Sequence, residues 1–271
     1  RFNPCWAKSW RKYATCWKPW SNRAPPARRN VKLKLSRILQ TQGWGSRRAC
    51  IERIRSGEVS VNGEPCSNPD AVFDTTNLQF SLEGETWAYR EKAILALHKP
   101  PGYECSHQPV HHPSVFSLLP PWLRAREVQC VGRLDHDTTG LLLFTDDGAL
   151  LHRITSPAKQ LGKVYAVSCK HPVDDAQLAA LNEGVQLRDE SAPTAALKCV
   201  RVDAKRLHMT IAEGKYHQVK RMVAAAGNRV EALHRVAVGG YTLPPDLAPG
   251  AWCWLESADL PRLEGHEHGS T

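Results

Sequence analysis

The chain has 271 residues, of which 42% are hydrophobic and 23% are charged, and its formal net charge is +9. This length allows one or two domains, each large enough to bury its own core. No apolar run approaches the roughly 20 residues that cross a bilayer, and the N-terminus lacks the apolar segment of a signal peptide. We therefore expect a cytoplasmic protein with no membrane partner.

The positive charge is concentrated at one end. Residues 1–51 contain 13 of the 36 basic residues and no acidic one, which leaves 23 basic and 27 acidic residues for the rest of the chain. A basic pole attached to a mildly acidic body is typical of nucleic-acid-binding proteins. The nine cysteines are scattered, with no pair spaced for metal ligation, so we expect reduced thiols and no metal site.

Residues 1–32 form an irregular, basic and tryptophan-rich extension. It shows neither the period of a strand nor that of a helix, and the chain does not begin with methionine. We hypothesise that this extension is not native and that the native start lies at Val31 or Leu33. The alternative is a native basic arm that stacks RNA bases on its tryptophans.

Two short helices and a hairpin are predicted next. Apolar residues at helical spacing begin at Leu35, and Gly43 ends that helix. Ser46 can cap a second helix, Arg47–Arg55, and the dipeptide Asn62-Gly63 predicts a hairpin turn. A small domain over residues 33–92 follows, with residues 81–92 interpreted as a turn-rich passage into a larger domain.

The larger domain is predicted over residues 93–260, with a tail at 261–271. Its expected elements are strands at 93–97, 164–168, 196–202 and 207–211, and helices at 174–181 and 216–226. Strands outnumber helices, and the last two strands can pair across a short turn. We therefore predict an α+β fold with a mixed, mostly antiparallel sheet.

The run Gly-Arg-Leu-Asp-His-Asp-Thr-Thr-Gly at 132–140 precedes the apolar residues 141–144. Asp135 thus lies in a turn-rich loop ahead of a buried strand, where the backbone can fix a carboxylate at the edge of a sheet. The spacing of Asp135 and Asp137 also imitates the first motif of haloacid-dehalogenase-type phosphatases. That match is weak, because Arg133 interrupts the apolar run that precedes the motif in those enzymes.

This run, together with Lys163-Val164-Tyr165 and Glu-Gly-Lys-Tyr-His-Gln-Val-Lys-Arg-Met at 213–222, resembles pseudouridine synthases of the ribosomal small-subunit synthase A type. The resemblance extends from about Leu33 to Leu255. It implies an alpha-L RNA-binding domain followed by a catalytic domain with the pseudouridine synthase fold. It makes Asp135 the catalytic residue, places Tyr165 against the target uracil and pairs Lys220 with the aspartate.

Helical spacing supports the assignment of Lys220, because this residue lies beside an apolar stripe that includes Val219 and Met222. The resemblance implies isomerisation of uridine in 16S ribosomal RNA at uridine 516, without cofactor. A monomer is the default expectation. A 23S ribosomal RNA target is the alternative. A non-catalytic RNA-binding assembly factor is the alternative from another class.

Arginines are the candidate RNA contacts. Those of the predicted small domain can lie along RNA phosphates, which supplies affinity with little sequence information. Arg133 and Arg221 lie within the motifs at 132–140 and 213–222, and Arg221 could equally face solvent. The candidates are Arg37, Arg47, Arg48, Arg53, Arg133 and Arg221.

Overall fold

The computed structural model of the chain describes residues 31–156 and 159–263. The expectations for the basic extension up to residue 30, and for the tail from residue 264, lie outside these ranges. Within them, no helix combines the length and the apolar character needed to cross a membrane.

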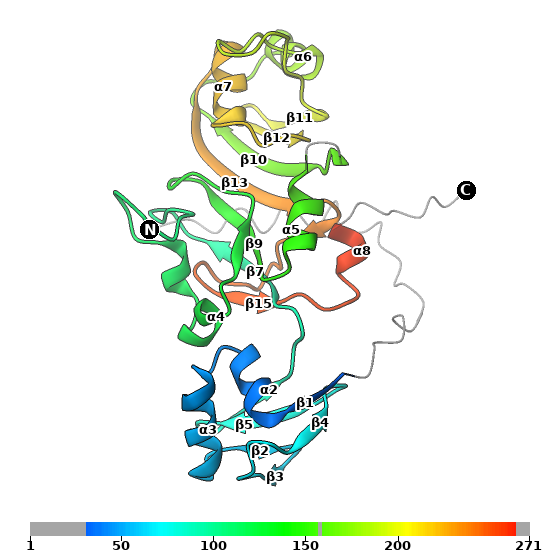
Figure 1. Cartoon of the computed structure of the whole chain (residues 1–271). Coiled ribbons are helices and arrows are strands. Elements are labelled where there is room, and N and C mark those ends of the chain that lie inside the picture. Colours follow the sequence, from blue (N-terminus) through cyan, green and yellow to red (C-terminus); the bar gives the residue numbers. More distant parts are fainter. Residues whose placement is uncertain (1–30, 157–158, 264–271) are drawn as a thin grey trace, which may run out of the picture.

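The N-terminal part contains two helices and two small antiparallel sheets (Figure 1). Its elements are β1 (Lys32–Lys34), α2 (Leu35–Thr41), α3 (Arg47–Arg55), β2 (Ser60–Val61), β3 (Glu64–Pro65), β4 (Val72–Asp74), β5 (Gln79–Leu82) and β6 (Glu85–Ala88). The Ser46 hydroxyl accepts a hydrogen bond from Ala49 N, so α3 begins where the sequence predicts. Positive φ angles at Asn62 and Gly63 form the predicted turn between β2 and β3.

Residues 81–92 were expected to be a passage between domains, and this expectation is wrong for most of the segment. Strands β5 and β6 form a hairpin there, with Glu83 and Gly84 both at positive φ in its turn. Alternation explains the hairpin, because Phe80 and Leu82 point into the core of the N-terminal part. The passage is limited to residues 89–93, between β6 and the next strand.

The large part is built on a nine-stranded sheet of the described residues, in the order β11-β12-β10-β13-β9-β7-β15, with β14 beside β13 and β8 beside β9 (Figure 1). The strands are β7 (Ile94–Lys99), β8 (Gln129–Val131), β9 (Thr139–Thr145), β10 (Lys163–Cys169), β11 (Lys198–Asp203), β12 (Arg206–Ile211), β13 (Val230–Val238), β14 (Tyr241–Thr242) and β15 (Trp252–Trp254). Only the β13 and β9 pair is parallel among the described strands. The predicted α+β class with a mixed, mostly antiparallel sheet is confirmed.

Six short helices of the described ranges cover this sheet. They are η3 (Val115–Leu118), α4 (Pro121–Ala125), α5 (Gly148–Thr155), α6 (Asp175–Glu183), α7 (Gln218–Ala225) and α8 (Leu260–Leu263). Helix α7 begins two residues later than predicted, because His217 adopts a left-handed conformation (φ 49°, ψ 31°). Leu263 of α8 is fully buried, so the large part includes residues that the sequence assigned to a tail.

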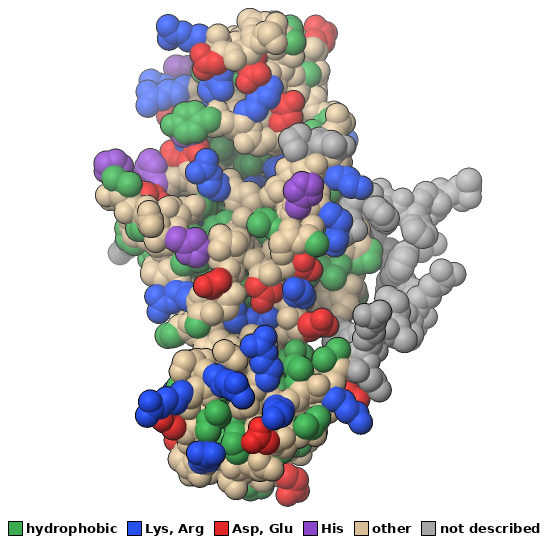
Figure 2. Space-filling model, in the orientation of Figure 1, with side chains coloured by type: hydrophobic (Ala, Val, Ile, Leu, Met, Phe, Trp, Pro, Cys, Tyr) green, Lys and Arg blue, Asp and Glu red, His purple; other side chains and the backbone are tan. Residues whose placement is uncertain are grey.

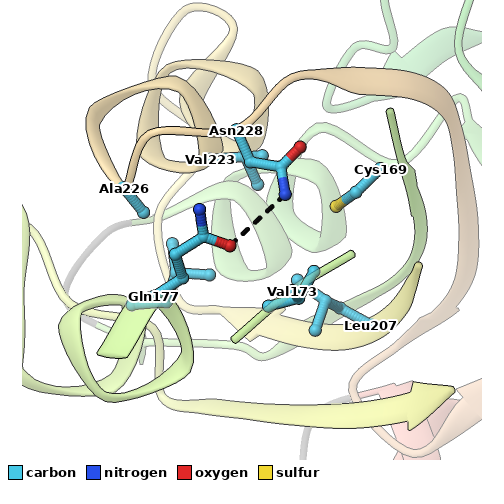
Figure 3. A pocket seen from close by; sticks show the side chains of 8 residues that line it. Cys169, Val173, Gln177, Leu207, Val223, Ala226 and Asn228 are labelled. Carbon is cyan, nitrogen blue, oxygen red and sulfur yellow. Dashed lines mark hydrogen bonds between the residues drawn. The ribbon is translucent and has the colours of Figure 1, made fainter. Parts of the chain in front are cut away.

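Helices α6 and α7 lie together at the β11 and β12 end of the sheet (Figure 1). A hollow between them and the sheet is lined mainly by apolar side chains, and Gln177 bonds Asn228 across it (Figure 3). The hollow offers essentially no volume to a water-sized molecule. It is a packing gap in the core and does not hold a ligand.

The two parts of the chain meet through tryptophans. Trp44 of the N-terminal part stacks on Trp122 of α4, with ring centroids 5.9 Å apart and planes inclined by 15°. Trp87 contacts the same ring edge-on at 4.9 Å. At Gly43, a Cβ would lie only 1.9 Å from the carbonyl oxygen of Trp122, so this approach requires glycine.

Hydrogen bonds also join the N-terminal part to the large part. Gln42 is buried, and its Oε1 accepts from Arg90 N at 3.1 Å and from Arg126 Nη1 at 3.1 Å. Arg126 in turn forms a buried ion pair with Asp146, at 2.6 Å. The junction therefore fixes the N-terminal part against the large part with both apolar and polar contacts.

Candidate active site

The loop that carries Asp135 joins β8 to β9. Gly140, the second residue of β9, lies at φ 104°, and a Cβ there would be 2.2 Å from the carbonyl oxygen of Arg235. Only glycine permits such an approach between β9 and β13. The close contact brings the Asp135 loop alongside β13, which also pairs with β10.

Lys99, the last residue of β7, binds the backbone of this loop. Its side chain is fully buried, and its Nζ donates to the carbonyls of Asp135 (3.1 Å), His136 (3.1 Å) and Thr138 (2.9 Å), and to that of Pro100 (3.2 Å). Burial lowers the pKa of Lys99, while nearby acidic groups oppose that shift. The buried ammonium thus fixes the backbone on both sides of Asp135.

The carboxylate of Asp135 contacts two side chains from α7 and its approach. Oδ2 lies 2.9 Å from Lys220 Nζ, and Oδ1 lies 3.3 Å from His217 Nε2. The Asp135 side chain is 25% exposed, so it is both oriented by partners and open to a ligand. The structure brings together Asp135 and Lys220, as the sequence predicted.

Lys220 also binds Asp137, at 2.7 and 3.0 Å. Burial acts against the charged form of Lys220, but its hydrogen bonds to Asp137 and Asp135 outweigh burial and raise the pKa of Lys220. Burial likewise acts against ionised Asp137, and the hydrogen bond and charge of Lys220 overcome it and lower the pKa of Asp137. One ammonium therefore bridges two carboxylates.

Helix α7 delivers Lys220 to this place. Val219, Met222 and Val223 are buried against the sheet, as the apolar stripe predicts, and Lys220 lies at the margin of that stripe. The left-handed His217 turns the chain immediately before the helix. Both partners of Asp135 therefore come from the first turn of α7 and the residue that precedes it.

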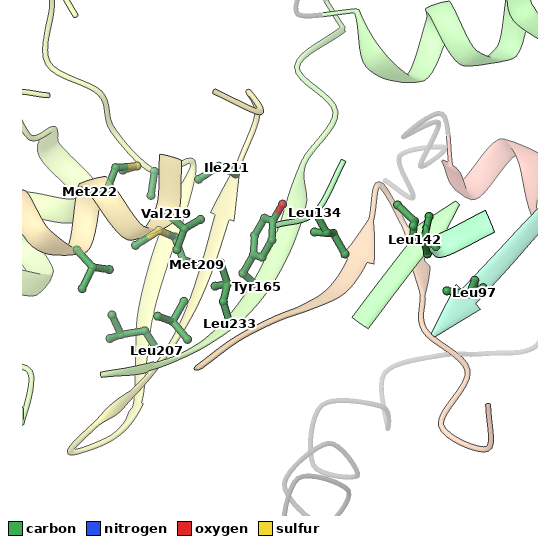
Figure 4. Packing of buried hydrophobic residues seen from close by; sticks show 14 of the residues in the cluster. Leu97, Leu134, Leu142, Tyr165, Leu207, Met209, Ile211, Val219, Met222 and Leu233 are labelled. Atoms are coloured by element: carbon green, nitrogen blue, oxygen red, sulfur yellow. The ribbon is translucent and has the colours of Figure 1, made fainter. Parts of the chain in front are cut away.

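Tyr165 lies on β10 within the main core and is 7% exposed. Its ring points toward Leu134, the neighbour of Asp135 (Figure 4). Tyr165 thus forms part of the floor beside the Asp135 loop.

The candidate RNA-binding arginines divide into two groups. Arg37, Arg47 and Arg48 are exposed on the N-terminal part, where lysines and arginines gather (Figure 2), and half-buried Arg53 is paired with Glu83 at 2.7 Å. The structure does not bring these side chains to Asp135. Arg133 is exposed two residues before Asp135, whereas Arg221 on α7 is half-buried and lies 3.3 Å from Asp189.

Three residues of this region were missed as participants by the sequence analysis: Lys99, His217 and Arg235. Arg235 is 1% exposed, its Nε donates to Leu141 O at 2.7 Å, and its Nη2 has no partner among the described residues. The available signal was a basic residue within a predominantly apolar strand. That pattern marks Lys99 at the end of β7 and Arg235 in β13, whereas no local signal marks the fold-dependent contact of His217.

Comparisons with known proteins identify relatives of this chain. The RNA pseudouridylate synthase family model matches residues 93–225. Ribosomal small subunit pseudouridine synthase A of Vibrio vulnificus (strain CMCP6) is 39% identical over 230 residues, which cover 84% of this chain and 98% of that protein. The protein of the same name from Escherichia coli (strain K12) has the same identity and coverage.

A solved pseudouridylate synthase is similar in both sequence and structure. Its crystal structure matches with a TM-score of 0.61 and 35% identity, over 85% of this chain and 99% of its own. The similarity therefore spans the N-terminal part as well as the large sheet. The chain belongs to the RNA pseudouridine synthase family of isomerases.

Proposed function

We propose that this chain isomerises a uridine of ribosomal RNA to pseudouridine and that Asp135 is its catalytic residue. The observation that carries the proposal is the Asp135 carboxylate, partly exposed and held 2.9 Å from the Lys220 ammonium. The names of the similar proteins support ribosomal RNA as the substrate.

The reaction requires little beyond positioned side chains. The bond between ribose and the ring nitrogen is cut, the uracil turns, and a ring carbon is joined to the same sugar. A carboxylate must act at the sugar or the ring, a surface must retain the detached base, and the nucleotide must leave its stack. Asp135 is the carboxylate of this proposal, and Tyr165 is the surface.

Lys220 has a defined task in this scheme. Water leaves the site when a nucleotide enters, and loss of water disfavours an ionised carboxylate. A cation 2.9 Å away compensates for part of the lost water and keeps the Asp135 carboxylate oriented. His217, 3.3 Å from the other carboxylate oxygen, restricts rotation of the group.

RNA affinity is assigned mainly to the N-terminal part, which resembles an alpha-L domain. Exposed arginines on α2 and α3 can neutralise phosphates of a folded RNA. Arg133 is proposed to contact RNA near the target nucleotide, whereas Arg221 is already paired with Asp189. The tryptophan junction supports a fixed distance between the two contact regions.

The proposed target is uridine 516 of 16S ribosomal RNA, modified by a monomer. The names of the similar small-subunit synthases support this choice over a 23S target. The phosphatase alternative receives no support, because Asp135 and Asp137 precede β9 and share the Lys220 ammonium.

Mapping pseudouridine across ribosomal RNA tests the proposal. Cells that lack the gene should lose one 16S mark, and the wild-type gene should restore it whereas Asp135→Asn should not. A missing 23S mark would redirect the assignment. An Asp135→Asn protein that restores the mark would refute the role of Asp135, and RNA binding with no mark lost would favour the non-catalytic assembly factor.

Tyr165→Phe and Lys220→Ala test the other two roles with the purified protein and a 16S transcript. The phenylalanine variant retains the ring and should bind RNA normally, so any loss of rate reports on the hydroxyl. Normal turnover by Lys220→Ala would contradict the proposed pairing with Asp135.

A further inference from the structure

Tyr216 presents an aromatic ring to solvent at the edge of the candidate site. Its relative exposure is 73%, and it is the sole aromatic residue among the strongly exposed large hydrophobic side chains of the described ranges. Exposed apolar side chains are common and usually carry no function. The surroundings of this ring distinguish it from that general case.

The Tyr216 ring stacks on a histidine that contacts the Asp135 carboxylate. Tyr216 lies parallel to the His217 imidazole, with centroids 3.8 Å apart and an interplanar angle of 19°. Nε2 of the same His217 ring lies 3.3 Å from Asp135 Oδ1. Neighbouring side chains in a chain normally diverge, and the left-handed backbone of His217 permits this parallel arrangement.

The loop that carries the ring is braced. Gln218 is buried, its Oε1 accepts from Lys215 N at 3.1 Å, and its own backbone N donates to Lys215 O at 3.1 Å. The backbone carbonyl of Tyr216 accepts from Arg221 Nη1 at 3.4 Å. A ring held this way loses little conformational freedom when a ligand packs on it.

The charges of the loop do not favour a phosphate as the ligand. Lys215 already lies 2.9 Å from Glu190 and 3.0 Å from Glu213, and Arg221 lies 3.3 Å from Asp189. Three carboxylates therefore surround the base of the loop and compensate its two cations. What the loop offers a nucleic acid is the uncovered face of the Tyr216 ring.

We propose that the Tyr216 ring stacks on the nucleobase adjacent to the target uridine. This inference rests on the proposed function and adds a contact that positions the substrate strand. A base that is left without its neighbour when the uridine leaves the helix exposes one face. The Tyr216 ring supplies a replacement surface for that face. Only the His217 imidazole separates this ring from the Asp135 carboxylate.

Three variants test the proposal in the full-length chain. Tyr216→Leu removes the ring but retains an apolar side chain, and Tyr216→Phe retains the ring. Val200→Ala, on the edge strand β11, is the control for loss of an exposed apolar group. Each is compared with the wild type for RNA Kd, for the salt dependence of Kd, and for single-turnover rate at saturating RNA.

We expect Tyr216→Leu to weaken binding of a 16S fragment by about 5- to 150-fold, the range that corresponds to loss of one stacked base. The salt dependence of Kd should not change, because no phosphate contact is removed. The rate at saturating RNA should stay within about threefold of the wild type. Tyr216→Phe and Val200→Ala should bind as the wild type does.

A direct measurement uses 2-aminopurine placed on either side of the target uridine. Binding by the wild type and by Tyr216→Phe should quench one of the two probes further than binding by Tyr216→Leu. Unchanged Kd for Tyr216→Leu, or equal quenching by all proteins, would overturn the inference. A reduced rate with unchanged Kd would also overturn it, because the ring would then act only through His217.

These outcomes are separable from failure of the proposed function. A wild-type protein that forms no pseudouridine in ribosomal RNA would refute that function. The binding and quenching measurements would still report whether Tyr216 stacks on a base.

Discussion

Replacement of Lys99 by methionine tests how the Asp135 loop is held. Methionine has nearly the same length and fills the same space, but it donates no hydrogen bond. The substitution therefore removes one buried ammonium from four carbonyls, three of which belong to the loop between β8 and β9. We expect a larger loss of rate than of stability.

The magnitude follows from the remaining partners of each carbonyl. The carbonyl of Asp135 still accepts from Thr138 N at 3.1 Å, and that of His136 from Gly102 N at 2.7 Å. The buried carbonyl of Thr138 loses its bond to Lys99, and such a loss costs about 1–3 kcal/mol. Removal of a desolvated charge offsets part of that cost.

The effect on rate is expected to be greater. Without the ammonium, the backbone around Asp135 can move, and a displacement of about 1 Å at a reacting group lowers rates by about 100-fold. Urea unfolding followed by tryptophan fluorescence measures the stability, and single-turnover pseudouridine formation measures the rate. Both are measured at a temperature at which the variant remains folded.

Lys163→Met is the matched control. Lys163 on β10 is half-buried, and its Nζ donates to the carbonyls of Leu161 (3.2 Å) and Ala212 (2.9 Å), outside the Asp135 loop. We expect a comparable loss of stability with a rate within about fivefold of the wild type. A Lys99→Met rate as close to the wild type as that of the control would refute the assigned role of Lys99.

Three further predictions concern other parts of the molecule. Gly43→Ala should destabilise the protein by about 1–3 kcal/mol and separate the unfolding of the two parts in calorimetry, because its Cβ would lie 1.9 Å from Trp122 O; one unchanged transition would contradict this. Arg47→Ala combined with Arg48→Ala should reduce the slope of log Kd against log salt by about 1.4–1.8 if each arginine contacts one phosphate; an unchanged slope would remove them from the RNA interface. Burial, with a contribution from the charge of His98, lowers the pKa of His234 to about 4 from 6.5. The unfolded chain therefore binds a proton there at higher pH than the folded chain, and up to about 3 kcal/mol of stability is lost as pH falls from 6.5 to 4. His234→Gln should flatten this part of the stability profile in urea unfolding, and an identical profile would refute the assignment.

Local signals explain which elements could be predicted from the sequence. Ser46 and the Asn62-Gly63 turn act within a few residues, and the structure has the predicted cap and turn. The hairpin at Glu83-Gly84 was missed because the flanking polar residues masked the alternation of Phe80 and Leu82. Its register depends on a core contributed by distant helices.

In the candidate site, too, local patterns were predicted and contacts between distant segments were not. The Asp135 motif and the apolar stripe beside Lys220 are local patterns, and both predicted where these side chains lie. The contacts of Lys99 and His217 join segments that are distant in the sequence, and no spacing rule reveals them. His217 has a left-handed backbone, and α7 therefore begins after it, at Gln218. This conformation depends on tertiary contacts, so the local sequence did not predict it.

Under the proposed function, the distribution of charge around Asp135 would suit one loop to a reaction that excludes water. Lys99 is a buried cation bound to the loop carbonyls, whereas Lys220 is a partly exposed cation bound to the loop carboxylates. Entry of a nucleotide lowers the local dielectric constant and strengthens both sets of contacts. The Asp135 carboxylate, 25% exposed before RNA binds, should therefore become more firmly held as RNA binds. In this arrangement Lys99 fixes the backbone of the loop, and Lys220 fixes the position of the Asp135 carboxylate. Loss of either lysine should therefore lower the rate, but for a different reason.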